Sequence, residues 1–326
     1  MTDTTSRARP EAIKAVPVRH PMRWVSAAVL AVLAAMFAHL LITNKAFNWS
    51  FMLDNMFRPP IIAGVRTTLS IAVLSMVLGV ALGIIIAVLR LSPNPLLSKS
   101  AWVYTWFFRA IPRIVLCTLF GDLGILWHRL EFGLPFDRQL GELVGIHDFT
   151  ARVWGVDART FLSGFAAAVL ALGLSEAAYM AEIVRAGISS IDPGQSEAAE
   201  ALGLNRGQAL RRVVLPQAMR VIVPPTGNEI IAMLKDTSLV IAIPVTSELF
   251  YQLSAVGNRT FQIVPMLVAA CIWYLIMVSV LMVIQFYVER YFSRGFGQSR
   301  GARRRPRAPL QSGPVTVLPV DPGSAA

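Results

Sequence analysis

The chain has 326 residues, of which 55% are hydrophobic and 15% are charged, and its mean hydropathy is +0.58. This composition is too apolar for an ordinary soluble domain, whereas a bilayer lets apolar side chains face lipid. The net charge of +11 lies at the ends of apolar runs and in the termini, which suits membrane topology better than a nucleic-acid-binding face. The sequence therefore predicts one polytopic, all-α helical membrane protein.

The N-terminal half begins with a tail and two clear apolar runs. Residues 1–24 are polar and basic, and we expect a cytoplasmic tail because no small-residue cleavage site follows cleanly. The first run, Val25–Thr43, has close to the ~20 residues that a helix needs to cross a bilayer. The second, Thr67–Leu89, has 23 residues without a charge. Within it, Gly79 and Gly83 are one turn apart, a spacing that permits close helix approach but also occurs in ordinary membrane helices.

The third apolar run is short and the fourth is clear. Ile114–Trp127 has only 14 residues and contains Asp122. It can span only if it extends back through Pro112, which would kink or break the helix. The fourth run, Phe161–Ile183, is long enough to span but contains the acidic Glu176. Charged residues inside a membrane segment are functional candidates by default.

Glu176 has two possible roles. On a helix it shares a face with Tyr179 and Ile183. From this face it could bind the amino group of a substrate, or it could form a structural pair with Arg109 or Arg113. The sequence does not separate these readings. Both place Glu176, Tyr179 and Arg109 among the candidate residues of a substrate pathway.

A polar connector, residues 186–220, follows the fourth run and must lie in water because no spanning helix could hold it. Its start predicts an Asp-capped helix with Pro at the first position and a capping box. Gly203 is suited to the left-handed residue that ends a helix, and a second capping box should open the next helix, which Pro216 ends or bends. The two boxes are Asp192-Pro193-Gly194-Gln195 and Asn205-Arg206-Gly207-Gln208.

Two further runs complete the predicted bundle. Val221–Val245 is interrupted by a polar stretch that includes Asp236 and Thr237, whereas Ile263–Val288 has no charge in 26 residues. A broken helix at membrane depth is tolerated where it lines a cavity. A new helix N-terminus near Asp236 would favour a substrate carboxylate. Alternatively, this stretch lies at the cytoplasmic interface, where charges cost little.

The distribution of basic residues sets the orientation. Lys and Arg concentrate in residues 1–24, in the connector and after Val288, which predicts six spans with both termini in the cytoplasm. Near the inner surface, Glu182 and Arg185 are spaced for an interfacial ion pair. The outward segment 128–160 either contacts a partner protein or is a folded insertion without a binding role. The basic tail, residues 291–326, is expected to be disordered, with arginines that suit anionic lipid head groups.

The sequence carries no pattern for chemistry of its own. The four histidines are scattered and lack metal-ligand spacing. The two cysteines lie inside apolar runs and are expected to be small packing residues. The phosphate-binding pattern GxxxxGK[ST] is absent. We therefore expect no catalytic residue, no metal and no bound cofactor in this chain.

The connector resembles the EAA loop of permease subunits of ATP-binding-cassette importers, with a valine in place of the more usual isoleucine. Neighbouring residues are similar to the polar amino-acid branch, and the resemblance covers residues 62–127 and 160–290. The stretch 108–112 departs from that branch, because Ala and Ile replace Gly and Thr. The residues that carry the resemblance are Glu197-Ala198-Ala199, Gly203, Val213, Leu215-Pro216-Gln217-Ala218, Ala178–Arg185, Gly194-Gln195, Lys235–Leu239 and Phe108–Pro112.

This resemblance implies a fold and a mechanism. Residues 62–290 would form the five-helix core of a type I importer, with residues 25–43 as one extra transmembrane helix, in a bacterial inner membrane. A second permease, identical or related, an ABC ATPase dimer and an extracytoplasmic solute-binding protein would complete the transporter. ATP would bind to the partner ATPase, and this chain would not be an enzyme. The coupling residues would be Glu197, Ala198, Ala199, Gly203, Leu215 and Pro216.

Three alternatives remain open at this point. The same machine could carry another small polar solute, such as an opine. A stand-alone secondary transporter or channel would explain the spans and the buried charges but not the capped connector. A membrane-embedded enzyme would need a nucleophile, base or metal constellation that the sequence does not contain.

Overall fold

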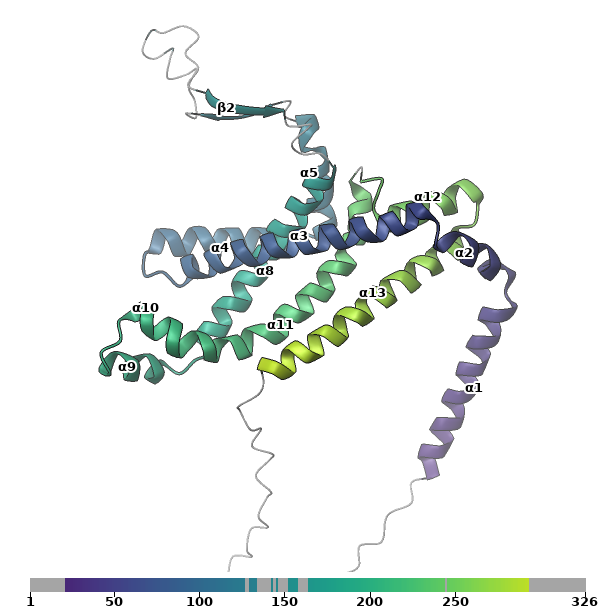
Figure 1. The fold of residues 1–326 in the computed structure, drawn as a ribbon, viewed down its shortest axis with the longest axis horizontal. Coiled ribbons are helices and arrows are strands. Elements are labelled where there is room, and N and C mark those ends of the chain that lie inside the picture. Colours follow the sequence, from purple (N-terminus) through teal and green to yellow (C-terminus); the bar gives the residue numbers. More distant parts are fainter. Residues whose placement is uncertain are drawn as a thin grey trace, which may run out of the picture.

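The computed structural model describes most of the chain as a bundle of long helices (Figure 1). The described residues are 21–126, 129–133, 142, 145, 152–157, 164–243 and 245–292. The predicted N-terminal tail (apart from residues 21–24), the rest of the 128–160 segment and the tail after residue 292 lie outside them. The elements are α1 (Pro21–Thr43), η1 (Lys45–Phe47), α2 (Trp49–Met56), α3 (Pro59–Arg90), α4 (Pro95–Ala110), α5 (Arg113–Leu126), β1 (Arg129–Gly133), β2 (Arg152–Asp157), α8 (Gly164–Ser189), α9 (Pro193–Ala201), α10 (Arg206–Ala209), η2 (Leu210–Val214), α11 (Leu215–Asp236), η3 (Thr237–Ala242), α12 (Leu249–Thr260) and α13 (Ile263–Phe292).

The helix pair α3 and α8 forms the centre of the bundle. Glycines on α3 make the close approach possible: a Cβ on Gly79 would lie 2.6 Å from the Glu176 Cγ, and one on Gly83 would lie 2.5 Å from the Met180 Cβ. On α8, Ala177 and Ala181 are fully buried. The predicted close approach at the glycine pair is confirmed, because small residues on both helices let the backbones meet.

The third predicted span is broken where the sequence places a proline. Helix α4 ends at Ala110, α5 begins at Arg113, and the two axes differ by 102°. Pro112 lies in the break, where its missing N–H and fixed φ interrupt the helix. The bend leaves Arg113 at the first position of α5, inside the bundle.

Four of the six predicted spans are found as single helices among the described residues, and a fifth if one bent pair counts as a span. Four helices are long and apolar enough to cross a membrane, namely α1, α3, α8 and α13, and the bent pair α4–α5 can be a fifth. The remaining predicted span, Val221–Val245, is not among the helices that are long and apolar enough to cross a membrane. This segment forms α11 and η3, and α11 carries Glu229 and other polar residues. Such a helix is tolerated at membrane depth where it faces protein or a cavity.

Most of the helix caps predicted in the connector are found in the structure. Asp192 caps α9 by accepting a hydrogen bond from the Gly194 N–H at 2.8 Å. The first capping box is nevertheless incomplete, because the Gln195 side chain accepts from Gln217 Nε2 instead of bonding back to the cap. The second box is confirmed in full, with Asn205 and Gln208 bonded in both directions.

The prediction that Pro216 ends the second connector helix is wrong, whereas the alternative that Pro216 bends it stays a prediction. After α10, the chain makes the π-helical turn η2 and continues directly into α11. Pro216 lies in the first turn of α11, directly after η2. It has no N–H to donate to a carbonyl of the preceding turn. The connector is therefore continuous with a helix of the bundle.

The elements at the other end of the bundle are short. Strands β1 and β2 pair antiparallel beyond α5, with an irregularity between Phe132 and Gly133. Helix α12 lies far from α9 and α10, and α1 diverges from the rest of the bundle (Figure 1). No residue of the 18-residue apolar window of α1 is buried. The two-stranded hairpin is a small addition to an otherwise all-α fold.

Candidate functional site

Three carboxylates gather around one arginine in the middle of the bundle. Arg113 Nη2 lies 3.0 Å from Glu176 Oε2 and 3.6 Å from Glu229 Oε2, and Arg113 Nη1 donates a hydrogen bond to Asp236 Oδ2. We call these four residues the acidic cluster. Counting one charge per side chain, the cluster carries three negative charges and one positive charge. It therefore has a net negative charge before a substrate enters.

Glu176 is the deepest member of the acidic cluster. Its side chain is fully buried, whereas those of Glu229 and Asp236 are 24% and 29% exposed. Oxygen Oε2 accepts from Arg113, but the other oxygen, Oε1, has no hydrogen-bond partner among the described residues. A buried carboxylate oxygen without a donor is costly, so this atom is available to a cationic or hydrogen-bonding ligand.

The local fold explains how the members meet. Pro112 starts α5 at Arg113, and the α-helix of α11 gives way to 3-10 turns directly after Asp236. Glu229 precedes Asp236 by seven residues, which places both on one face of α11. Gly79 supplies the space beside Glu176. Three separate helices thus aim charged groups at one point.

The predicted substrate-pathway residues fall into two groups. Glu176, Tyr179 and Asp236 come together, because Arg113 Cζ lies 4.8 Å from the Tyr179 ring centroid, within the range of a cation–π contact. The Glu176 partner is Arg113 and not Arg109. Arg109 also lies over the Tyr179 ring, at 5.4 Å. It is exposed.

Thr237 does not enter the acidic cluster. It is fully buried, and its hydroxyl donates to the Leu234 carbonyl at 2.7 Å. The predicted helix N-terminus at this point is wrong, because η3 begins without a side-chain cap and the next α-helix starts at Leu249 with Glu248 as its N-cap. The carboxylate-binding dipole expected beside Asp236 is therefore absent.

Sequence reasoning missed two members of the site. Glu229 and Gly79 were not singled out for the cluster, although the spacing of Glu229 from Asp236 was a usable signal. The predicted ion pair of Glu182 with Arg185 is confirmed at 2.8 Å, and Arg90 of α3 joins it at 3.1 Å. This second ionic group ties the end of α3 to α8, near the connector.

The connector exposes part of the predicted coupling surface. Glu197, Ala198 and Pro216 are exposed, Leu215 is 37% exposed and Ala199 is buried against the connector. Gly203 has φ +81°, and no atom lies within 4 Å of the position its Cβ would take. The left-handed helix end predicted there is confirmed, since L-residues other than Gly rarely adopt this conformation.

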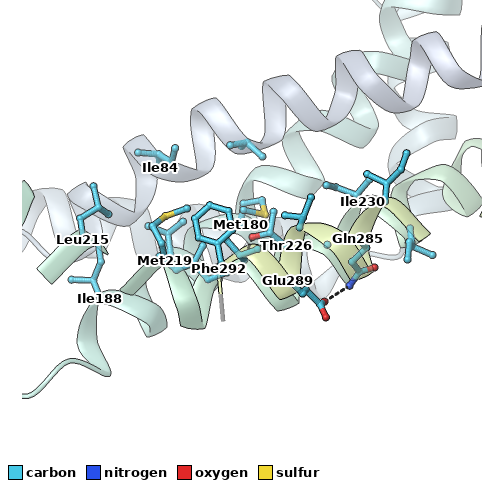
Figure 2. Close-up of a pocket in the computed structure, with 18 of the residues that line it drawn as sticks. Ile84, Met180, Ile188, Leu215, Met219, Thr226, Ile230, Gln285, Glu289 and Phe292 are labelled. Carbon is cyan, nitrogen blue, oxygen red and sulfur yellow. Dashed lines mark hydrogen bonds between the residues drawn. The ribbon is translucent and has the colours of Figure 1, made fainter. Parts of the chain in front are cut away.

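A separate apolar groove of about 600 Å³ lies between α3, α8, α11 and α13, and its lining includes Ile188 and Leu215 of the connector (Figure 2). Almost all of its lining is hydrophobic, including Ile84, Met180 and Met219. Its polar groups Gln285 and Glu289 bond to each other at 2.7 Å. The groove shares no residue with the acidic cluster and offers few partners for a polar solute.

No metal centre competes with this site in the described residues. Within residues 21–126, 164–243 and the other described stretches, no group of three or more His, Cys, Asp or Glu side chains could hold a metal ion. The expectation that the chain binds no metal or cofactor remains a prediction.

Comparisons with known proteins agree with this arrangement. Residues 79–294 match the family described as binding-protein-dependent transport system inner membrane component. The chain is 43% identical to the arginine transport system permease protein ArgU of Corynebacterium glutamicum, over 92% of this chain and 89% of that protein. It is 39% identical to the L-cystine transport system permease protein TcyL of Bacillus subtilis, over 62% of this chain and 74% of that one. In structure it is similar to an amino acid ABC transporter crystallised with histidines, with a TM-score of 0.56, 29% identity, and coverage of 74% of this chain and 98% of that chain.

Proposed function

Because the chain belongs to the family of binding-protein-dependent transport system inner membrane components, and is a permease subunit of an ATP-binding-cassette importer of polar amino acids, we propose that its cargo is a cationic amino acid such as arginine. The main support for this cargo is the buried oxygen Oε1 of Glu176, which accepts no hydrogen bond from the described residues. A guanidinium or ammonium group would supply that donor and a charge. The arginine permease among the relatives supports the same cargo.

The charge balance of the acidic cluster favours a cation. Three carboxylates face Arg113. Arg109 lies over the same Tyr179 ring but is exposed, so it balances the buried carboxylates less than Arg113 does. A planar guanidinium can bond a carboxylate through two N–H groups. The α-ammonium group that all amino acids share could also donate to Glu176 Oε1. The excess of carboxylates in the acidic cluster is therefore what favours cargo with a second cation on its side chain.

The remaining machinery follows from the same proposal. A cytoplasmic ATPase dimer would bind the exposed connector face at Glu197, Ala198 and Gly203 and would hydrolyse the ATP. A second permease subunit and an extracytoplasmic solute-binding protein would complete the transporter. The chain is a multi-pass membrane protein. We propose that both of its termini are cytoplasmic, as the basic residues favour.

Two alternatives are less well supported. Another small polar solute, such as an opine, would fit if it carried a cationic group. A stand-alone transporter would leave the capped, exposed connector without a role.

Uptake with paired substrates tests the cargo. Reconstituted with its ATPase and binding protein, the permease should transport arginine about 10–100-fold better than citrulline, its neutral isostere, since one charged hydrogen bond contributes roughly 1.5–3 kcal/mol. Glu176→Gln should remove most of this preference. Glu182→Gln is the matched control, a carboxylate on the same helix that already has two arginine partners, and it should keep the arginine-to-citrulline ratio. Equal uptake of arginine and citrulline by the wild-type complex, or an unchanged ratio in Glu176→Gln, would overturn the proposal.

A further inference from the structure

A second buried carboxylate joins three helices beside the acidic cluster. Glu248 is fully buried and caps the N-terminus of α12. It accepts hydrogen bonds from Thr68 Oγ1 of α3 at 2.8 Å, from the Tyr274 hydroxyl of α13 at 3.0 Å and from the Tyr251 N–H of α12 at 3.1 Å. We call Glu248, Thr68 and Tyr274 the outer joint.

The outer joint is held by hydroxyl groups and a backbone amide. None of the ion pairs found in the described residues includes Glu248. A buried carboxylate without a cation is costly and depends on every donor that it has. The positions of α3, α12 and α13 are therefore mutually dependent at this residue. A shift of one helix must break a bond or move the other two.

The outer joint also touches the segment that follows the acidic cluster. The Tyr274 hydroxyl lies 3.5 Å from Thr237 Oγ1. Thr237 comes directly after Asp236, whose carboxylate accepts from Arg113. A separation of 3.5 Å is at the outer limit for a hydrogen bond, so a small displacement of Thr237 strengthens or abolishes this contact. The joint is thus placed to sense the position of Asp236.

We propose that Glu248 is a positioning residue that couples cargo binding at the acidic cluster to the outer end of the permease. Cargo that binds the carboxylates of Glu176 and Asp236 moves Asp236 and the adjacent Thr237. Tyr274 and Glu248 pass this displacement to α12, which lies at the end of the bundle away from the connector (Figure 1). This inference rests on the proposed function, in which that end faces the solute-binding protein.

The test uses a variant that removes one hydroxyl and nothing else. Tyr274→Phe keeps the ring and leaves the Glu248 cap on α12 intact. Tyr104→Phe is the matched control, because the Tyr104 hydroxyl also makes a bond inside the bundle, to the Leu174 carbonyl at 2.8 Å, but lies outside the outer joint. In the reconstituted complex, the measured quantity is the ratio of ATPase activity with arginine-loaded binding protein to basal ATPase activity.

Tyr274→Phe should lower this ratio about tenfold while basal activity stays near wild type. It should also lower the melting temperature, because buried Glu248 loses one of its donors. Tyr104→Phe should leave the ratio unchanged. Thr237→Val should act through the same contact, so that Tyr274→Phe combined with Thr237→Val costs no more than the larger single change. A wild-type ratio in Tyr274→Phe, an equal loss in Tyr104→Phe, or additive losses in the double variant would each overturn the inference.

Failure of the cargo proposal looks different in this assay. If the wild-type complex responds to binding protein loaded with glutamine or glutamate and not to arginine, the proposed cargo is wrong. The three variants are then compared with the amino acid that does stimulate, and the same outcomes decide the role of the outer joint.

Discussion

Gly79→Ala should damage the acidic cluster through one methyl group. The new Cβ would lie 2.6 Å from Glu176 Cγ and 2.7 Å from Glu176 Cβ, whereas carbon atoms pack best about 3.5–4.0 Å apart. Helix α3 and the Glu176 side chain must therefore separate by about 1 Å. The side chain cannot simply rotate away, because Arg113 holds its Oε2 at 3.0 Å.

The expected magnitude follows from this clash. Overpacking typically costs about 1–3 kcal/mol, and displacement of Glu176 weakens a buried charge-assisted bond. If this free-energy cost weakens arginine binding at the acidic cluster, arginine uptake should drop about 10–100-fold, because about 1.4 kcal/mol corresponds to one factor of ten. The assay is the initial rate of labelled arginine uptake into proteoliposomes, with the melting temperature of the complex measured in parallel.

Gly83→Ala separates packing from function. Its Cβ would lie 2.5 Å from Met180 Cβ, one turn away on the same helix pair, so it should destabilise the bundle by a similar amount. It does not touch Glu176. We expect Gly83→Ala to lower the melting temperature but to keep the arginine-to-citrulline ratio. Normal uptake by Gly79→Ala, or an equal loss of selectivity in Gly83→Ala, would refute the reasoning.

Three further predictions concern the connector and the second ionic group. Gly203→Val should abolish transport while membrane insertion stays normal, because a β-branched residue is strained at φ +81°; Gly207→Ala, with no positive φ, should transport nearly normally, and equal uptake by both variants would count against the strain argument. Asn205→Ala removes the confirmed capping box and should destabilise the connector by about 1 kcal/mol, seen as faster hydrogen exchange across residues 206–214; unchanged exchange would contradict a stabilising cap. Glu182→Gln leaves Arg90 and Arg185 without their carboxylate, and we expect a lower melting temperature of the complex, whereas an unchanged value would show that this group contributes little.

The sequence predicted the features that depend on local chemistry. Glu176 was recognisable because an acidic residue inside an apolar run is costly. Gly203 and Asn205 were recognisable because their roles at helix ends depend on neighbouring residues only. The break at Pro112 was predicted for the same reason.

The features that were missed depend on the path of the chain in three dimensions. Arg109 and Arg113 were equivalent partners for Glu176 in the sequence, and only the 102° bend decides that Arg113 faces α8. The outer joint assembles Thr68, Glu248 and Tyr274 from distant parts of the chain, and no local pattern brings them together. The end of the helix predicted at Pro216 was wrong because the π-helical turn η2 continues without a break into α11.

A structure of the assembled transporter with bound arginine tests the central claim most directly. We predict a nitrogen atom of the arginine within hydrogen-bond distance of Glu176 Oε1, the oxygen that has no partner among the described residues. Arginine bound elsewhere, for example in the apolar groove beside Met219, with that oxygen still unoccupied, would contradict the account.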